Sequence, residues 1–87
     1  MAHRSVFPGF DGLAEQRVRV IGDLVHERQR RGLSQTEIAA RMRTSQSAVA
    51  RLESGAGDVR LSTLQRYAAA VGRDLEWRLV RREEEAP

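Results

Sequence analysis

Residues 33–55, with the sequence LSQTEIAARMRTSQSAVARLESG, predict the fold of this chain. They divide into two short helical stretches, each opened by a serine, with a turn of about three residues that begins at Arg43. Ser34 and Glu37 have the spacing of a capping box, in which each side chain bonds a backbone N–H near the other residue. Ser45 is placed to cap the second stretch. This pattern predicts a helix-turn-helix.

The second helical stretch has a polar face and an apolar face. We expect the polar face to be exposed and to consist of Gln46, Ser47, Ala50 and Arg51. We expect the opposite face to be buried and to consist of Ala48, Val49 and Leu52, with Ala39 and Ala48 allowing the two helices to cross closely. A short helix with hydrogen-bonding side chains near its N-terminus fits the major groove of DNA, where glutamine can pair with adenine and arginine can reach guanine. The pattern therefore predicts base contacts by Gln46, Ser47 and Arg51.

Apolar spacing predicts a helix on each side of this motif. The first is expected to run from about Asp11 to Arg31 and to end at Gly32, with a buried face of Ala14, Val18, Ile21 and Val25. The last is expected to be capped by Ser62 or Thr63 and to end at Gly72, with a face of Leu61, Leu64, Ala68 and Val71 and with Tyr67 beside it. The prediction is an all-α, compact bundle of four to five helices.

Composition narrows the classes of function. The chain has 87 residues, enough for one small domain, and it has no cysteine and only two histidines, so we expect no disulfide, no metal site and no cofactor. No long apolar run predicts a membrane span or a secretory signal, which favours a cytoplasmic protein. No catalytic constellation or phosphate loop points to an enzyme or to a small-molecule ligand. The net charge is +3 and all fifteen basic residues are arginine, which suits a polyanionic partner.

The chain is expected to divide into four parts. Residues 1–10 read as a flexible arm, 11–72 as the DNA-binding domain, 73–82 as a dimerisation segment and 83–87 as an acidic disordered tail. In the third part apolar and polar residues alternate, which favours a strand that pairs with the same strand of a second copy. The predicted dimer interface consists of Leu75, Trp77 and Leu79. The alternative for this part is a fifth helix.

Three short motifs together resemble those of the lambda-repressor-like, or Cro/Xre-type, helix-turn-helix family. They are QTEIA at 35–39, SQSAV at 45–49 and RLESG at 51–55, and the resemblance covers residues 18–71. It implies a bundle of four or five helices that binds double-stranded operator DNA as a homodimer on an inverted repeat. The fold and function so implied are those of a transcriptional regulator, most simply a repressor.

The resemblance also implies roles for individual residues. Gln35 would touch a backbone phosphate and brace Gln46, and the backbone N–H groups around Ser54 and Gly55 would meet another phosphate. Further phosphate contacts are expected from Arg41, Arg43, Thr44 and Ser45. A buried ion pair is expected between Arg28 and Glu53.

Arg43 departs from the family pattern, which usually has glycine at this position in a left-handed conformation. That conformation costs a residue with a side chain on the order of 1 kcal/mol. Two outcomes are open: the turn is reshaped, or Arg43 offsets the cost through a phosphate contact.

A second resemblance concerns the end of the chain. The sequences LQRYAAAVG at 64–72 and LEWRLV at 75–80 are similar to those of HigA-type antitoxins, which bind a partner toxin and repress their own operon. The alternative function is therefore that of an antitoxin. A protein-interaction module would favour an apolar or acidic front on the second helix of the motif, and RNA binding would favour exposed aromatic residues, which the motif lacks.

Overall fold

The computed structural model describes residues 10–76, 78, 79 and 81, and the side chains of α1 from Glu15 onward. Four helices follow one another: α1 (Phe10–Arg30), α2 (Gln35–Met42), α3 (Gln46–Glu53) and α4 (Leu61–Ala70). The described chain contains no strand, and the predicted all-α helix-turn-helix bundle is confirmed. No helix in these residues is both long and apolar enough to span a bilayer.

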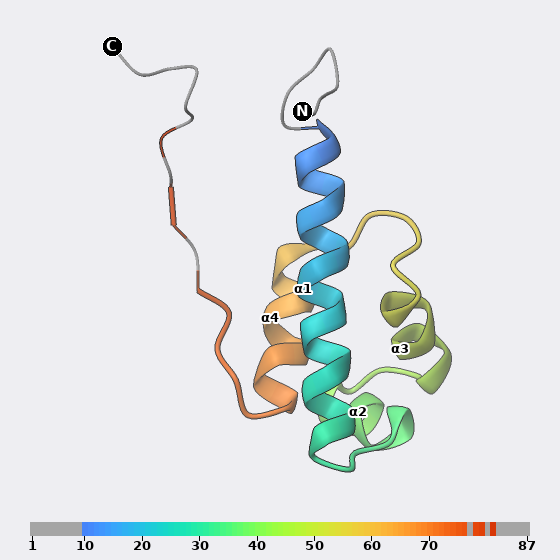
Figure 1. Ribbon diagram of the computed structural model, residues 1–87. Coiled ribbons are helices and arrows are strands. Elements are labelled where there is room, and N and C mark those ends of the chain that lie inside the picture. The colour runs from blue at the N-terminus through green and yellow to red at the C-terminus, as the bar shows by residue number, and fades with distance from the viewer. Residues whose placement is uncertain (1–9, 77, 80, 82–87) are drawn as a thin grey trace.

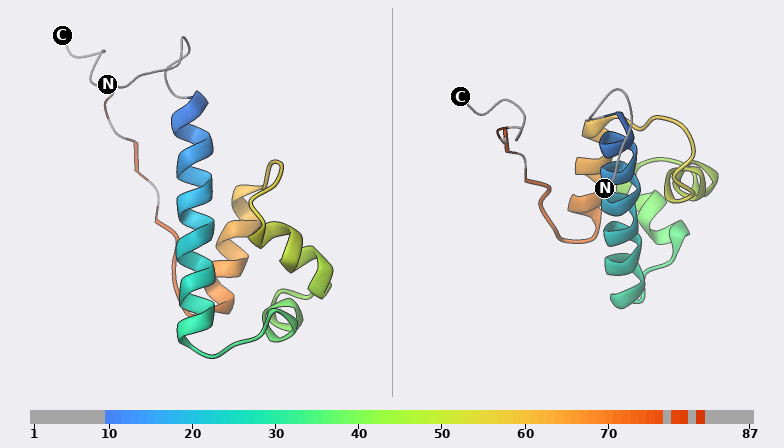
Figure 2. Two further views of the ribbon diagram at one scale, coloured as in Figure 1. Left: turned by 45° about the vertical axis from the view of Figure 1, so that its right-hand side comes forward. Right: turned by 45° about the horizontal axis from the view of Figure 1, so that its top comes forward.

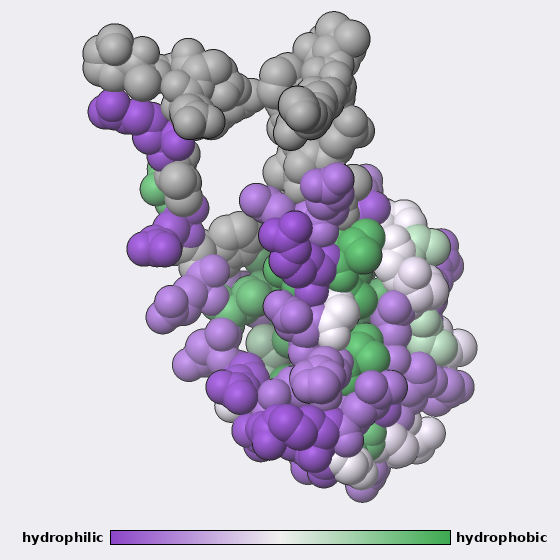
Figure 3. Space-filling model, viewed as in Figure 1, coloured by the Kyte–Doolittle hydropathy of each residue, from purple (hydrophilic) through white to green (hydrophobic). Residues whose placement is uncertain are grey.

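The short helices pack around the second half of the long one. Figure 1 shows α4 beside α1, with α2 and α3 completing the bundle. Helix α2 also contacts α4. The core that they enclose is aliphatic and alanine-lined apart from one tyrosine: Ile21, Leu24, Ile38, Ala39, Met42, Val49, Leu52, Leu64, Tyr67, Ala68 and Val71. The face in Figure 3 is mostly hydrophilic, with separate hydrophobic patches.

The first turns of α1 extend beyond the other helices, as both Figure 1 and Figure 2 show. The prediction that Val18 is buried is therefore wrong: its side chain is 57% exposed, whereas Ile21 and Leu24 are buried. The helix begins at Phe10, one residue before the predicted cap at Asp11. A regular apolar spacing identifies the face of a helix, but it does not show how far along that face the neighbouring helices reach.

Three helices end in the same way. A left-handed residue follows each of α1, α2 and α4 within two positions: Gly32 (φ 70°), Arg43 (φ 58°) and Gly72 (φ 76°). At the end of α2 the Arg43 N–H bonds the Ala40 carbonyl at 3.2 Å and the Thr44 N–H bonds the Ala39 carbonyl at 2.9 Å. This is the pattern of a Schellman motif. The turn is therefore not reshaped: Arg43 takes the conformation that favours glycine.

The beginning of α4 differs from the prediction. Neither Ser62 nor Thr63 caps it; the N-cap residue is Arg60, whose side chain makes no capping hydrogen bond. The Arg60 carbonyl instead accepts from the backbone N–H groups of Thr63 and Leu64, at 3.0 and 3.1 Å. With Leu61 as its first residue, the helix includes both hydroxyl residues in its first turn.

Beyond Gly72 the described residues, 73–76, 78, 79 and 81, belong to neither a helix nor a strand. The alternative of a fifth helix is therefore wrong for residues 73–76. A strand in this segment would need a second chain for its backbone hydrogen bonds, so the predicted dimer strand stays a prediction. The predicted N-terminal arm up to residue 9 and the acidic tail lie outside the described residues.

Candidate DNA interface

The exposed face of α3 carries the residues predicted to contact bases. Gln46, Ser47 and Arg51 are exposed, while Val49 and Leu52, on the opposite side, are only 1% and 7% exposed. The prediction that Ala48 is buried is wrong, because Ala48 is exposed. Successive residues of a helix are about 100° apart, so the side chain of Ala48 points in a different direction from that of Val49. Ala48 belongs to the first turn of α3, where residues 46–48 are all exposed.

Ser45 fixes the beginning of α3. Its hydroxyl accepts a hydrogen bond from the Ala48 N–H at 3.1 Å, as an N-cap residue does, and lies 3.2 Å from the Ser47 hydroxyl. The N-terminal end of α3 therefore presents Gln46 and Ser47 next to backbone N–H groups that carry the positive end of the helix dipole. Such an end is suited to a phosphate or to an acceptor on a base edge.

Gln46 is held by α2. Its Nε2 donates to Oε1 of Gln35 at 2.6 Å, and Nε2 of Gln35 in turn donates to Oε1 of Glu53 at 2.9 Å. The two glutamines that the family resemblance relates are thus in contact. Two amide groups in series connect the exposed end of α3 with a carboxylate at its buried end.

Glu53 lies opposite Arg28, the partner that the resemblance assigned to it. Arg28 Nε donates to Glu53 Oε2 at 2.7 Å and Arg28 Nη2 donates to Glu53 Oε1 at 3.1 Å, so the guanidinium makes a two-point contact. Both side chains are nearly buried, at 11% and 8% exposed. Arg28 Nη1 also donates to the Leu33 carbonyl at 2.7 Å, which connects α1 with the chain entering α2.

Tyr67 is a member of this network that the sequence analysis placed only beside the apolar face of the last helix. The residue is fully buried in α4, and its hydroxyl donates to Glu53 Oε2 at 2.6 Å. The signal for it was a single tyrosine on the apolar face of a helix, because a buried tyrosine hydroxyl requires a hydrogen-bond partner. The identity of that partner depends on how α3 packs against α4.

The network keeps Glu53 ionised. Burial alone would raise the pKa of its carboxyl group, but hydrogen bonds from Arg28, Tyr67 and Gln35 together outweigh burial and hold the pKa below its ordinary value. Burial and the adjacent Glu53 carboxylate raise the pKa of the Tyr67 hydroxyl, so the tyrosine remains a donor. The hydrogen bonds to Glu53 raise the pKa of Arg28.

The residues expected to contact phosphates form two groups: one at the helix ends and turns of the helix-turn-helix, and a pair of arginines at the C-terminal end of α2. Gln35, Thr44, Ser45 and the Ser54–Gly55 turn lie at the ends of α2 and α3, and all of these except the partly buried Gln35 and Gly55 are exposed. In that turn the Ser54 hydroxyl donates to the Arg51 carbonyl at 2.6 Å.

Arg41 and Arg43 lie in the last turn and at the end of α2. Arg41 Nη1 donates to the Ala70 carbonyl of α4 at 2.8 Å, while Arg66 of α4 donates to the Met42 carbonyl of α2. Each of these two helices thus supplies an arginine to the C-terminal end of the other. Arg41 therefore has a structural role in addition to the phosphate contact predicted for it.

A second charged cluster, which sequence reasoning did not anticipate, surrounds Glu27. This buried carboxylate accepts from Arg30, the last residue of α1, and from Arg31, which follows it, at 2.7 and 2.8 Å, and lies 3.2 Å from Arg73, beyond α4. Hydrogen bonds from Arg30, then Arg31 and Arg73, hold the pKa of Glu27 far below its usual range. The cluster ties the exit from α4 to the end of α1.

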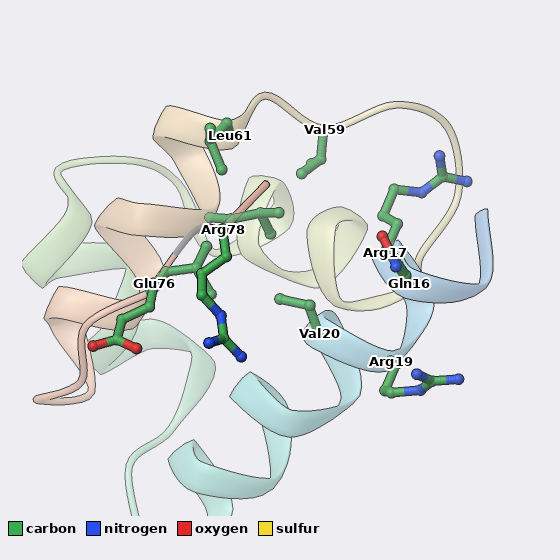
Figure 4. A pocket seen from close by; sticks show the side chains of 10 residues that line it. Gln16, Arg17, Arg19, Val20, Val59, Leu61, Glu76 and Arg78 are labelled. Atoms are coloured by element: carbon green, nitrogen blue, oxygen red, sulfur yellow. The ribbon is translucent and has the colours of Figure 1, made fainter. Parts of the chain in front are cut away.

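Two of the three residues predicted to form a dimer interface, Leu75 and Leu79, differ in exposure. Leu75 packs against the core of its own chain, whereas Leu79 is 99% exposed; Trp77 lies outside the described residues. Leu75 also lines an open hollow of about 520 Å³ between α1, the beginning of α4 and the segment after α4. Figure 4 shows the walls of this hollow, which include Val20, Val59, Leu61, Glu76 and Arg78.

Comparison with known proteins agrees with this geometry. A family model described as Helix-turn-helix matches residues 26–78, which include α2, α3 and α4. The chain belongs to this helix-turn-helix family.

Two curated relatives were found, both named Antitoxin HigA1, from the CDC 1551 / Oshkosh and ATCC 25618 / H37Rv strains of Mycobacterium tuberculosis. Each is 42% identical to this chain over 76 residues, which is 84% of this chain and 50% of the relative. The chain thus spans about half the length of the curated relatives it matches. No solved structure matches the chain significantly.

Proposed function

We propose that this protein is a transcriptional regulator that binds double-stranded DNA sequence-specifically, with α3 in the major groove. The observation that carries the proposal is the hydrogen bond from Gln46 to Gln35, which holds an exposed amide at the N-terminal end of α3. The Helix-turn-helix family supports the same reading. Gln46, Ser47 and Arg51 would contact bases, and no residue is assigned a catalytic role.

A homodimer would place two copies of α3 in successive major grooves, about 34 Å apart, on an inverted repeat. Phosphates would be contacted by Gln35, Arg41, Arg43, Thr44, Ser45, Ser54 and Gly55. These contacts would supply affinity and register, whereas the exposed face of α3 would supply sequence preference. Repression by occupancy of a promoter follows most simply from such a dimer, and the site of action would be the cytoplasm.

A second function is favoured by the comparisons: that of an antitoxin, which binds a toxin protein and represses its own operon. The relatives named Antitoxin HigA1 align with 84% of this chain at 42% identity. Both functions use the same DNA interface and differ in the protein partner. Co-expression of the product of the adjacent gene with this chain, followed by purification and a growth assay, distinguishes them.

The DNA-binding proposal is tested by selecting bound sequences from random duplexes and titrating the selected duplex at several salt concentrations. With about six phosphates neutralised, log K should fall against log salt concentration with a slope of about −5. The selected duplex should be preferred over a scrambled one at moderate ionic strength. Equal affinity for all duplexes, or an affinity independent of salt, would refute the proposal.

A further inference from the structure

The Glu53 carboxylate imposes a direction on the hydrogen bonds around it. Its Oε1 accepts from Arg28 Nη2 and Gln35 Nε2, and its Oε2 accepts from Arg28 Nε and the Tyr67 hydroxyl, at distances of 2.6–3.1 Å. These four bonds use the accepting capacity of a carboxylate. Because an ionised carboxylate only accepts, every group that faces Glu53 must be a donor.

The donor-to-acceptor direction set by Glu53 also fixes the orientation of the Gln35 amide. A side-chain amide has an oxygen and a nitrogen of similar size, and the hydrogen-bond network decides which way it is turned. Since Gln35 gives Nε2 to Glu53, its Oε1 is turned toward Gln46 and can only accept. Gln46 must therefore present Nε2 to Gln35.

The direction then determines what Gln46 offers to DNA. With one hydrogen of Nε2 used by Gln35, the amide retains its Oε1 and its other N–H, an acceptor beside a donor. Adenine presents the complementary pair in the major groove, a donor at N6 and an acceptor at N7. If both amides were reversed, Gln46 would bond Gln35 through Oε1 and would offer two N–H groups, which suit the two acceptors of guanine, N7 and O6.

Tyr67 and Arg28 hold the carboxylate in the position that this requires. Arg28 comes from α1 and Tyr67 from α4, so Glu53 is fixed from both sides by donors on helices that carry no residue expected to contact DNA bases. The Tyr67 hydroxyl is fully buried and its phenol ring is packed in the core, which leaves it little freedom to move. The network thus connects all four helices to the amide of Gln46.

We therefore propose that Glu53 and Tyr67 are positioning residues for base selection: through Gln35 they fix the orientation of the Gln46 amide and so favour adenine over guanine at the base that it faces. This inference rests on the proposed function, because it requires that Gln46 contacts a base. Neither residue needs to touch DNA.

The test compares four duplexes that differ only at the base pair read by Gln46, which is the position at which Gln46→Ala abolishes preference. A well-placed two-point contact discriminates by about 5- to 150-fold, so the natural protein should prefer adenine by a factor in that range. Glu53→Gln, which can present either a donor or an acceptor to Gln35, should reduce the adenine-to-guanine ratio to within about threefold. Tyr67→Phe, which removes only the hydroxyl, should lower the ratio several-fold.

Glu37→Gln is the matched control. It makes the same carboxylate-to-amide change on α2, but Glu37 bonds the Ser34 backbone at 2.7 Å, outside the network, and glutamine also serves in a capping box. Its adenine-to-guanine ratio should equal that of the natural protein. The salt dependence of binding should be unchanged in Tyr67→Phe, because the number of phosphate contacts is the same.

A measurement without DNA distinguishes a change in the hydrogen bonding of the two amides from a change in overall DNA affinity. The chain has five glutamines, and the side-chain amide signals of Gln35 and Gln46 can be assigned by nuclear magnetic resonance. In the natural protein their hydrogens should exchange slowly with water. In Glu53→Gln, and to a smaller extent in Tyr67→Phe, exchange should accelerate, whereas in Glu37→Gln it should not.

The outcomes separate this inference from the proposed function. If the natural protein shows no base preference, the proposed function fails. If the natural protein has a preference that Gln46→Ala leaves unchanged, Gln46 contacts no base and this inference is overturned, while sequence-specific DNA binding through other residues stands. If the natural protein prefers adenine but Glu53→Gln and Tyr67→Phe weaken all four duplexes equally, the network only supports the fold and the inference is overturned. If only Glu53→Gln changes the ratio, the role of Tyr67 is overturned.

Discussion

Arg28 and Glu53 are 25 positions apart in the chain and make a two-point contact with a shortest distance of 2.7 Å. The contact joins the last turns of α1 to the last residue of α3, and only about a tenth of either side chain is exposed. Removing one partner of such a pair leaves a buried charge without compensation. The orientation of α3 against α1 therefore depends on this contact as well as on the core.

Glu53→Ala is expected to lower the free energy of unfolding by about 3–5 kcal/mol, because it leaves the Arg28 guanidinium unpaired and Tyr67 without an acceptor. Urea unfolding followed by circular dichroism measures the loss. Asp58→Ala is the control: Asp58 pairs with Arg17 at 3.3 Å but is fully exposed, so no measurable loss is expected. Equal effects of the two substitutions would contradict the assignment.

Glu27→Gln should destabilise the protein at neutral pH, and its difference from the natural protein should shrink in acid. The pKa of Glu27 is lowered by the arginines around it, so its contribution is present above the usual value of 4.5 and is lost as pH falls toward the folded-state pKa. Unfolding by urea at pH 7 and at pH 3 measures the change. Glu15→Gln, at an exposed position of α1, is the control and should leave the free energy of unfolding at pH 7 nearly unchanged.

The fold could be predicted from the sequence because its signals are local. Ser34 and Glu37 form the predicted capping box, with bonds of 2.7 and 3.0 Å, and Ser45 caps α3 as expected. The pattern of the motif identified Val49 and Leu52 as buried and placed Ala39 at the crossing of the two helices, where it is also buried. Such features depend only on residues within about one helical turn of each other.

What could not be predicted depends on packing between helices. The bond from Tyr67 to Glu53 and the cluster of Arg73 with Glu27 join residues 14 and 46 positions apart. The predicted burial of Val18 and Ala48 is wrong because helix periodicity does not indicate where a neighbouring helix ends. The role of each residue toward DNA remains a prediction, since it concerns a partner that lies outside the chain.

Leu79→Ala should weaken self-association without weakening the fold. Leu79 is 99% exposed, so its side chain contributes nothing to the core of its own chain, and the predicted dimer segment would bury it against a second copy. Sedimentation equilibrium should show a larger dimer dissociation constant with an unchanged melting temperature at low concentration. Leu75→Ala should affect both, because Leu75 also packs on the core. An unchanged association constant in Leu79→Ala would exclude this residue from the interface.

Gln46→Ala should relax preference at one base step by about 1–3 kcal/mol while leaving binding to unrelated DNA nearly unchanged. The Gln46 side chain is exposed, and its known contact within the protein is with Gln35, so the fold should tolerate the change. Competition titrations against the four base pairs at that step measure the preference. A uniform loss on every duplex would show that Gln46 only positions the protein.

Arg43→Gly should change stability and DNA affinity in opposite directions. Arg43 is the one non-glycine residue with positive φ in the described chain, and glycine relieves a cost on the order of 1 kcal/mol, so the melting temperature should rise. If Arg43 contacts a phosphate, affinity should fall for all sequences and the salt slope should decrease by about 1. Gly32→Ala is the matched control, because Gly32 occupies the same place in the Schellman motif of α1 with no atom within 4 Å of an added Cβ, and it should destabilise by a similar amount. A stabilised Arg43→Gly with unchanged DNA affinity would mean that the strain at this turn serves no DNA contact.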